Sequence, residues 1–245
     1  DHDRQSRITG AQFTEQIVYL PANSPYLPPP DAPPVGPLPA GRNAHLTFGS
    51  FARPNKISAS VVALWAQLLR ALPDARMLLG GMPEQDDGCA VIAWFEAEGI
   101  TRDRLILHPR CGMAAYLALH DQVDMCLHAL WMGVPTLTLA GPTAASRSGA
   151  SILGHVGLEA FVARDAADFV ARGMAWSRQL DELAALRAGL RERFMRSPRG
   201  QPALVAAGVA RALRLMWQRW CAGLPARAFE VTLQEIQPAR PETAG

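Results

Sequence analysis

Several features that mark particular protein classes are missing from this sequence. No apolar run approaches the roughly 18 residues that a membrane-spanning helix needs, and the chain does not open on the charged and apolar parts of a secretory signal. An excess of one charge is also lacking, because the formal net charge is only +2. We therefore expect no membrane segment, and the charge does not favour nucleic acid as a partner.

Cysteine is scarce and scattered. The four cysteines lie far apart and form no Cys-x-x-Cys pair: Cys89, Cys111, Cys126 and Cys221. We expect neither a zinc or other metal site nor a redox dithiol, and a reduced, cytoplasmic setting. The chain starts abruptly with Asp1-His2-Asp3-Arg4, which we interpret as the interior of a longer protein.

Proline, by contrast, is concentrated in one place. Nine prolines lie between Pro21 and Pro39. Such a density prevents regular secondary structure and is typical of an extended, polyproline-like linker. Residues 12–20 before it are compatible with a short strand or a helix end. A domain boundary is therefore predicted here, with a globular domain that starts near Asn43.

From Asn43 onwards, short apolar strands alternate with helical periodicity, which predicts an α/β fold. We expect a Rossmann-like parallel sheet with helices on both faces. The expected strands cover residues 45–51, 75–81, 104–108, 123–127 and 160–163, and the expected helices cover 58–72, 88–98, 113–120, 150–154, 166–175, 178–194 and 202–220.

Residues 128–141 contain a compact helix-to-strand unit. The pattern predicts a short helix from His128, a Gly-Val-Pro turn, a fully buried strand and a stop at Gly141-Pro142. Ligands of parallel sheets bind at the strand ends and helix N-termini. His128 at the helix start is thus a candidate ligand contact, although a lone histidine there is more often an ordinary polar end group.

The turn after the first strand, residues 49–56, is a second candidate. Its small residues allow backbone N–H groups to approach an anion, and Lys56 supplies a charge for phosphate. The turn is neither a Walker A loop nor GxGxxG. On the pattern alone, a solvated lysine is the simpler interpretation.

Two further loops follow strand ends. In residues 108–113, the backbone around Cys111 is a candidate contact for the edge of a nucleobase, and Tyr116 is a candidate for stacking on its ring. Ordinary packing of these side chains is the simpler interpretation of the spacing. Residues 141–151 combine hydroxyl side chains with Arg147, and helix capping is an equal alternative. No Ser-His-Asp set or carboxylate pair indicates a hydrolase.

A set of motifs occurs together and in order along the chain. The motifs are Phe48-Gly49-Ser50-Phe51 with Lys56-Ile57, Arg104-Leu105-Ile106-Leu107, Val123-Asp124-Met125-Cys126-Leu127, Ala129-Leu130-Trp131-Met132-Gly133-Val134-Pro135, Ala145-Ser146-Arg147 with Ser151-Ile152-Leu153 and Gly157-Leu158, Ser197-Pro198, and Met216-Trp217. Together they resemble the C-terminal catalytic half of the protein O-GlcNAc transferase family, in a bacterial homologue, from about Gln12 to Val231.

The resemblance implies an inverting GT-B glycosyltransferase. Its donor would be UDP-GlcNAc and its acceptor a Ser or Thr hydroxyl of a protein, with no cofactor or metal. An N-terminal catalytic half and tetratricopeptide helices would belong to the same protein outside this chain. A transferase with another UDP-sugar or acceptor, such as asparagine, and a non-catalytic nucleotide- or protein-binding module remain alternatives.

The resemblance also assigns individual residues. Lys56 matches the lysine that contacts the donor diphosphate and stabilises the leaving group, and Tyr116 replaces a uracil-stacking histidine. His128 replaces an acidic residue near the ribose, and Met113 a lysine near the base. The catalytic candidate is Lys56, and the predicted nucleotide-binding residues are Ser50, Arg53, Lys56, Arg110, Cys111, Met113, Tyr116 and His128.

One departure from the family pattern lies between Leu127 and His128. The family has a Gly/Thr-rich diphosphate loop there, which is missing from this sequence, and we expect omitted residues rather than a true loss. The implied segments are 1–20 as the tail of the first catalytic half, 21–42 as linker, 43–200 as UDP-binding domain, 201–231 as a helix crossing back towards the first half, and 232–245 as tail.

Overall fold

The computed structural model describes residues 13–22, 24–30, 32–83, 89–126 and 130–236. The chain divides into two compact units. One unit contains residues 29–193, and the other combines the residues up to Pro28 with those from Phe194 onwards. The functional meaning assigned to the segments above stays a prediction.

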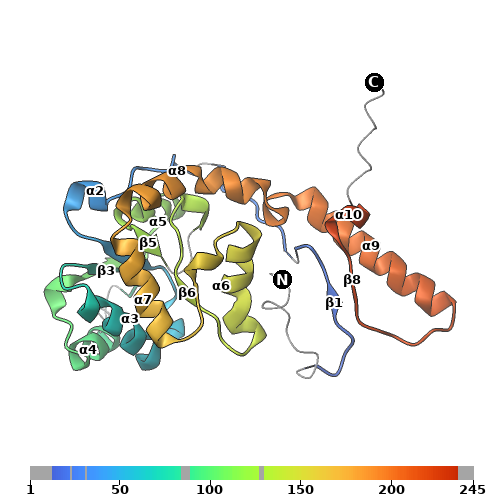
Figure 1. The fold of residues 1–245 in the computed structure, drawn as a ribbon, viewed down its shortest axis with the longest axis horizontal. Helices are drawn as coiled ribbons and strands as arrows, with labels where there is room; N and C mark the ends of the chain where they lie inside the picture. The colour runs from blue at the N-terminus through green and yellow to red at the C-terminus, as the bar shows by residue number, and fades with distance from the viewer. Residues whose placement is uncertain (1–12, 23, 31, 84–88, 127–129, 237–245) are drawn as a thin grey trace. The chain divides into compact units, whose positions relative to one another are not determined.

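The 29–193 unit is built on a parallel sheet with the strand order β4-β3-β2-β5. Figure 1 labels β3 and β5 of this sheet. Hydrogen-bonded registers place Gly49 beside both Leu78 and Cys126. The predicted parallel α/β sheet is therefore confirmed. The strands are β2 (Thr47–Ser50), β3 (Arg76–Met82), β4 (Leu105–Pro109) and β5 (Met125–Cys126).

A second pair of strands extends this arrangement. A parallel bridge joins Cys126 to Thr136, and β6 (Thr138–Leu139) pairs in parallel with β7 (Val162–Ala163). The chain is buried over 134–137, but both residues of β6 are only half-buried. The strand predicted to be fully buried is thus buried in its first part only.

Helices cover both faces of the sheet because successive strand residues point to opposite sides. Met77 shares an interior space with Trp65 of α3 (Ala59–Ala71) and Phe169 of α7 (Ala166–Ser177). The next residue, Leu78, packs instead with Leu117 of α5 (Met113–Ala118). Further elements of this part of the chain are α2 (Ala40–Asn43), η2 (Pro54–Lys56), α4 (Cys89–Ala97), η3 (Arg102–Arg104), η4 (Leu119–Gln122), η5 (Leu130–Met132), α6 (Ala144–His155), η6 (Glu159–Phe161) and α8 (Leu180–Arg196).

The second unit is smaller. In it, β1 (Val18–Tyr19) pairs in parallel with β8 (Phe229–Glu230). The 3-10 turn η7 (Pro198–Gly200) leads into the long helix α9 (Pro202–Cys221), which packs against α10 (Leu233–Ile236). None of the helices in the described ranges is long and apolar enough to cross a membrane.

Two local predictions differ from the structure. In the described part of segment 128–141, the expected helix is a single 3-10 turn, η5, because Gly133 follows it with a left-handed φ of 73°. The helix expected near 150–154 is longer, since α6 begins at Ala144 behind a capping box of Thr143 and Ser146.

Candidate functional site

The carboxyl ends of the parallel strands bring the predicted site residues to one edge of the sheet. β2 ends at Ser50, β4 ends at Pro109, and β5 lies hydrogen-bonded beside β2. The loops that follow β2 and β4 therefore emerge at the same edge. We call these loops, residues 50–56 and 110–113, the nucleotide edge, after the ligand that the family resemblance predicts for them.

The first loop turns sharply behind a buried serine. Ser50 is only 1% exposed, and its hydroxyl accepts a hydrogen bond from the N–H of Ala52 at 3.4 Å. The 3-10 turn η2 follows, and both Arg53 and Lys56 are exposed. Lys56 is the only lysine among the 245 residues. The loop thus carries two solvent-exposed cations, and the buried Ser50 hydroxyl holds its backbone at Ala52.

An aromatic group stands behind this loop. The Phe51 ring stacks on His120 at a centroid distance of 4.0 Å, and Tyr116 meets both rings edge-on, at 5.5 Å from Phe51 and 5.1 Å from His120. Nδ1 of His120 donates to the carbonyls of Tyr116 and Leu117 at 3.0 and 3.2 Å. Burial lowers the pKa of His120 to about 4, so its ring is neutral near pH 7.

Tyr116 is half-buried in this group, and burial raises the pKa of its phenol. The phenol is therefore neutral near pH 7, and it is α5 that positions the ring. Sequence reasoning identified Tyr116 but missed Phe51 and His120. A signal existed, because His120 lies four residues after Tyr116, which is the spacing of neighbours on a helix face.

The second loop is open to solvent. Arg110 and Cys111 are exposed, and Met113 is 62% exposed. The N–H of Arg110 donates to the carbonyl of Met82 at 3.1 Å, which fixes the start of the loop. Gly112 is the N-cap of α5 and provides no side chain to the helix's first N–H groups. The predicted residues of this loop therefore lie at the same edge as Lys56.

The remaining predicted positions fall elsewhere. His128, and with it the junction to Leu127, lies outside the described residues. Residues 127–135 connect the bridged positions Cys126 and Thr136, whereas parallel strands usually need a crossover of about a dozen residues or more. The crossover is short for this architecture, and the expectation of omitted residues stays a prediction.

At the start of α6, the hydroxyls of Thr143 and Ser146 contact each other at 2.9 Å and bond each other's backbone N–H groups. The capping interpretation is therefore confirmed for Thr143 and Ser146. No group of three or more His, Cys, Asp or Glu side chains within the described ranges is arranged to hold a metal ion.

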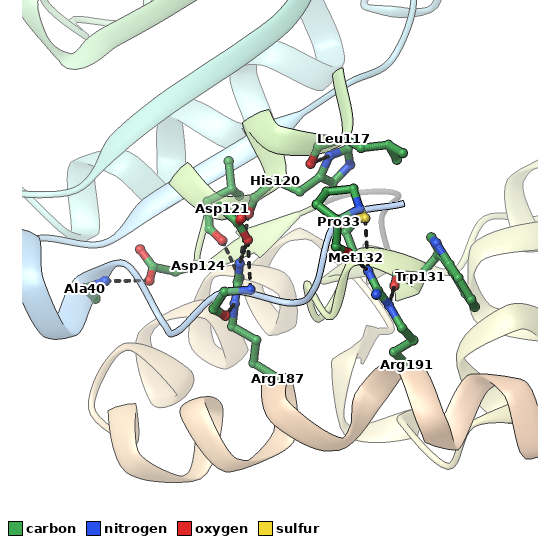
Figure 2. Close-up of polar contacts among 12 residues, drawn as sticks. Pro33, Ala40, Leu117, His120, Asp121, Asp124, Trp131, Met132, Arg187 and Arg191 are labelled. Atoms are coloured by element: carbon green, nitrogen blue, oxygen red, sulfur yellow. Dashed lines mark hydrogen bonds and ion pairs between the residues drawn. The ribbon is translucent and has the colours of Figure 1, made fainter. Parts of the chain in front are cut away.

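A polar network that sequence reasoning did not find joins α8, the proline-rich segment and the residues before β5 (Figure 2). Arg187 of α8 is 1% exposed and donates to the carbonyls of Gly36 at 2.8 Å, Val123 at 2.7 Å and His120 at 3.0 Å. It also pairs with Asp121 at 3.2 Å. Burial lowers the pKa of Arg187, while Asp121 opposes this shift. This guanidinium connects the proline-rich segment to the residues just before β5.

Asp124 makes the second link of this network. It is fully buried, and its two carboxylate oxygens accept from the N–H groups of Ala40 at 2.7 Å and Thr47 at 2.8 Å. Burial raises the pKa of Asp124, and the two N–H donors oppose that shift. The carboxylate thereby ties the start of α2 and the start of β2 to the residue that precedes β5.

The comparison with protein families agrees with this architecture. A parallel α/β sheet with exposed cations on the loops at its carboxyl edge is the architecture of a ligand-binding α/β domain. Residues 40–201 match the glycosyl transferase family 41, and the chain therefore belongs to this family.

Curated relatives carry a consistent name. The chain is 33% identical over 228 residues to a protein of Solanum lycopersicum, covering 86% of this chain and 24% of that protein. It is 32% identical over 246 residues to one of Arabidopsis thaliana, covering 93% and 27%. Both are named "Probable UDP-N-acetylglucosamine--peptide N-acetylglucosaminyltransferase SPINDLY". The chain thus spans about a quarter of the length of these relatives.

A solved structure also matches. The K-to-M mutant of the O-GlcNAc transferase of Thermobaculum terrenum is 32% identical, with a TM-score of 0.68 over 80% of this chain and 40% of that one. The resemblance to the C-terminal catalytic half of the O-GlcNAc transferase family, inferred from the motifs, is confirmed.

Proposed function

We propose that this chain is the nucleotide-binding half of an inverting transferase that moves GlcNAc from UDP-GlcNAc to Ser or Thr hydroxyls of proteins. Membership of glycosyl transferase family 41 and the names of the relatives support the reaction class. The observation that carries the proposal is the position of Lys56, exposed in the loop after β2 at the carboxyl edge of the sheet.

Lys56 is assigned to the leaving group. When the bond to the anomeric carbon breaks, UDP leaves with additional negative charge on its diphosphate. A fixed cation there stabilises this charge most in the transition state. Arg53 supplies a second cation three residues earlier on the same loop. The side chains of Arg53 and Lys56 are both exposed, so an anionic ligand in solvent can reach both charges.

The base is assigned to the second loop and the aromatic group. Backbone groups of Arg110 and Cys111 are offered to the base edge, and Tyr116 offers a ring held by Phe51 and His120. An aromatic ring packs well against the flat face of a nucleobase. His128 is assigned to the ribose. Separately, the cytoplasmic setting of the protein stays a prediction.

The rest of the same protein is the proposed structural partner. In the second unit, a groove of about 510 Å³ runs along α9. Leu213, Met216, Trp217, Trp220 and Leu224 line it and are between 49% and 77% exposed. Such a contiguous apolar patch is typical of an interface. Since relatives are about four times longer, we assign this groove to the first catalytic half.

The test uses the full-length protein and the Lys56→Ala variant. Titration with UDP by calorimetry and mass spectrometry of acceptor proteins after incubation with UDP-GlcNAc measure binding and transfer. Removing a transition-state contact of this kind typically lowers kcat by about 10²–10³-fold. We expect such a loss with an unchanged melting temperature. Arg53→Ala removes the second cation of the same loop and should lose less than Lys56→Ala.

Equal UDP affinity and equal turnover in Lys56→Ala would refute the role of this lysine. UDP binding by the wild type without transfer or donor hydrolysis would indicate a binding module. Transfer to asparagine would replace the proposed acceptor, and transfer from another nucleotide sugar in a panel of donors would replace the proposed donor. Neither result would change the role proposed for the nucleotide edge.

A further inference from the structure

Arg191 of α8 contacts two segments that are far apart in the sequence (Figure 2). Its Nε donates to the carbonyl of Trp131 at 3.0 Å, and its Nη2 donates to the carbonyl of Pro33 at 2.7 Å. The same Nη2 lies 3.4 Å from the sulfur of Met132, and the guanidinium carbon is 4.9 Å from the Trp131 ring centroid. One planar group therefore holds the end of η5 against the proline-rich segment.

Arg187, one helical turn earlier, makes the corresponding contacts on the other side of β5. It bonds the carbonyls of His120 and Val123, before β5, whereas Arg191 bonds Trp131, after β5. We call Arg187 and Arg191 the arginine clamp. The two side chains lie on one face of α8, four residues apart, so a single rigid helix grips the chain on both sides of the strand.

The contact between the turn after η5 and the proline-rich segment is close. A side chain at Gly133 would collide with Val35 and with the backbone carbonyl of Arg187. Gly133 also has a φ of 73°, which favours glycine. The turn after η5 is therefore packed against the side chain of Val35 and the backbone of Arg187, so a shift of η5 requires these two neighbours to shift as well.

This turn is connected to the nucleotide edge through β5. Cys126 is hydrogen-bonded in register with Gly49, the residue before Ser50, and η5 is the first element described after β5. We propose that Arg191 is a positioning residue for the donor nucleotide: it fixes η5 relative to the loop that carries Lys56. This inference rests on the proposed function and places no contact between Arg191 and the substrate.

A purely structural arginine would change stability alone, so the experiment measures nucleotide binding separately. We compare wild type, Arg191→Met and Arg191→Lys in the full-length protein. Arg193→Met, at an exposed position of the same helix, is the matched control. The readouts are UDP affinity by calorimetry, kcat and KM for UDP-GlcNAc, melting temperature, and hydrogen exchange of a peptide covering 130–136 with and without UDP.

We expect Arg191→Met to lose on the order of tenfold to a hundredfold in kcat/KM, because a small misplacement of a positioning group is costly. The peptide covering 130–136 should exchange faster and lose protection by UDP. Arg191→Lys keeps the charge but cannot bond both carbonyls through a planar fork, so it should recover only part of the loss. Arg193→Met should match the wild type.

The outcomes separate the two proposals. If the wild type does not bind UDP, the proposed function fails and this inference falls with it. If wild type, Arg191→Met and Arg191→Lys bind UDP and turn over equally, the proposed function stands and the positioning role is refuted. If Arg191→Met does not fold, Arg191→Lys decides: weaker binding at an unchanged melting temperature supports the role, and unchanged binding overturns it.

Discussion

The arginine clamp and the nucleotide edge use positive charge in opposite ways. Arg187 is almost fully buried and bonds three backbone carbonyls and a carboxylate. Arg53, Lys56 and Arg110 are all exposed at the ends of strands. The first set satisfies polar groups that burial would otherwise leave unpaired. The second set stays in water, where an anionic ligand can reach it.

The comparison shows which charged residues can be assigned a role from the sequence alone. A cation in a Gly-Ser turn after a strand is a candidate ligand contact, and the family resemblance then assigned Lys56 to the diphosphate. A cation on an amphipathic helix is most often solvated, so Arg187 and Arg191 were not identified. Their carbonyl partners lie far away in the chain, since the Arg187 contact to Gly36 joins positions 151 residues apart.

The largest effect is expected from breaking the clamp at its buried end. Arg187→Met removes the guanidinium donor from the carbonyls of Gly36, His120 and Val123, and it removes the ion-pair partner of Asp121. We expect a loss of about 3 kcal/mol or more in the free energy of unfolding. Chemical denaturation of wild type and variant measures it.

Arg193→Met serves as the exposed control and should change stability by less than about 0.5 kcal/mol. Equal stability of Arg187→Met and Arg193→Met would show that the buried bonds contribute nothing. Loss of the folded protein in Arg187→Met alone would agree with the prediction, and Arg187→Lys would then give a measurable intermediate.

The next effect is a pH dependence of the free energy of unfolding that comes from His120. The pKa of His120 is about 4 in the folded protein and 6.5 without its surroundings. Between pH 6.5 and pH 4, His120 is therefore protonated in the unfolded chain but neutral in the folded protein. Stability from this residue is fully present above pH 6.5 and is lost as pH falls towards 4, by about 3 kcal/mol.

His120→Phe keeps a ring against Phe51 but cannot titrate. The free energy of unfolding of wild type and variant, measured from pH 7.5 to pH 4, isolates the contribution of His120 from that of the carboxylates. Parallel curves for the two proteins would contradict the assignment. The variant also loses the Nδ1 bonds, which shifts its curve by a constant and leaves its slope informative.

The sheet and the placement of its loops were predictable because they follow from local pattern and topology. Alternating strands and helices predict parallel strands, and parallel strands bring their carboxyl ends together. Ser50, Lys56 and Cys111 reached one edge for that reason. The capping residues Thr143 and Ser146 were also foreseeable, since the start of a helix selects hydroxyl side chains.

What could not be predicted depends on contacts between distant segments. The proline-rich segment was expected to be a linker, yet residues 33–40 are held by Arg191, Arg187, Asp121 and Asp124. Proline density describes the local conformation of a segment but not the surface on which it lies. Asp124 gave a similar difficulty, because its two N–H partners lie 77 and 84 residues away.

The smallest expected effect tests the exposed side of the comparison. Tyr116→Ala removes the ring assigned to the base, whereas Tyr116→Phe keeps the ring and removes only the hydroxyl. Aromatic contacts of this kind contribute about 0.5–1.5 kcal/mol, which corresponds to roughly a twofold to tenfold loss of UDP affinity. Calorimetry should show this loss for Tyr116→Ala and near wild-type affinity for Tyr116→Phe. Tyr116→Ala also loses edge contacts to Phe51 and His120, so a melting temperature for each variant must accompany the titration. A drop in stability with unchanged UDP affinity would assign Tyr116 to packing alone, and would leave Lys56 and the second loop as the groups that hold the nucleotide.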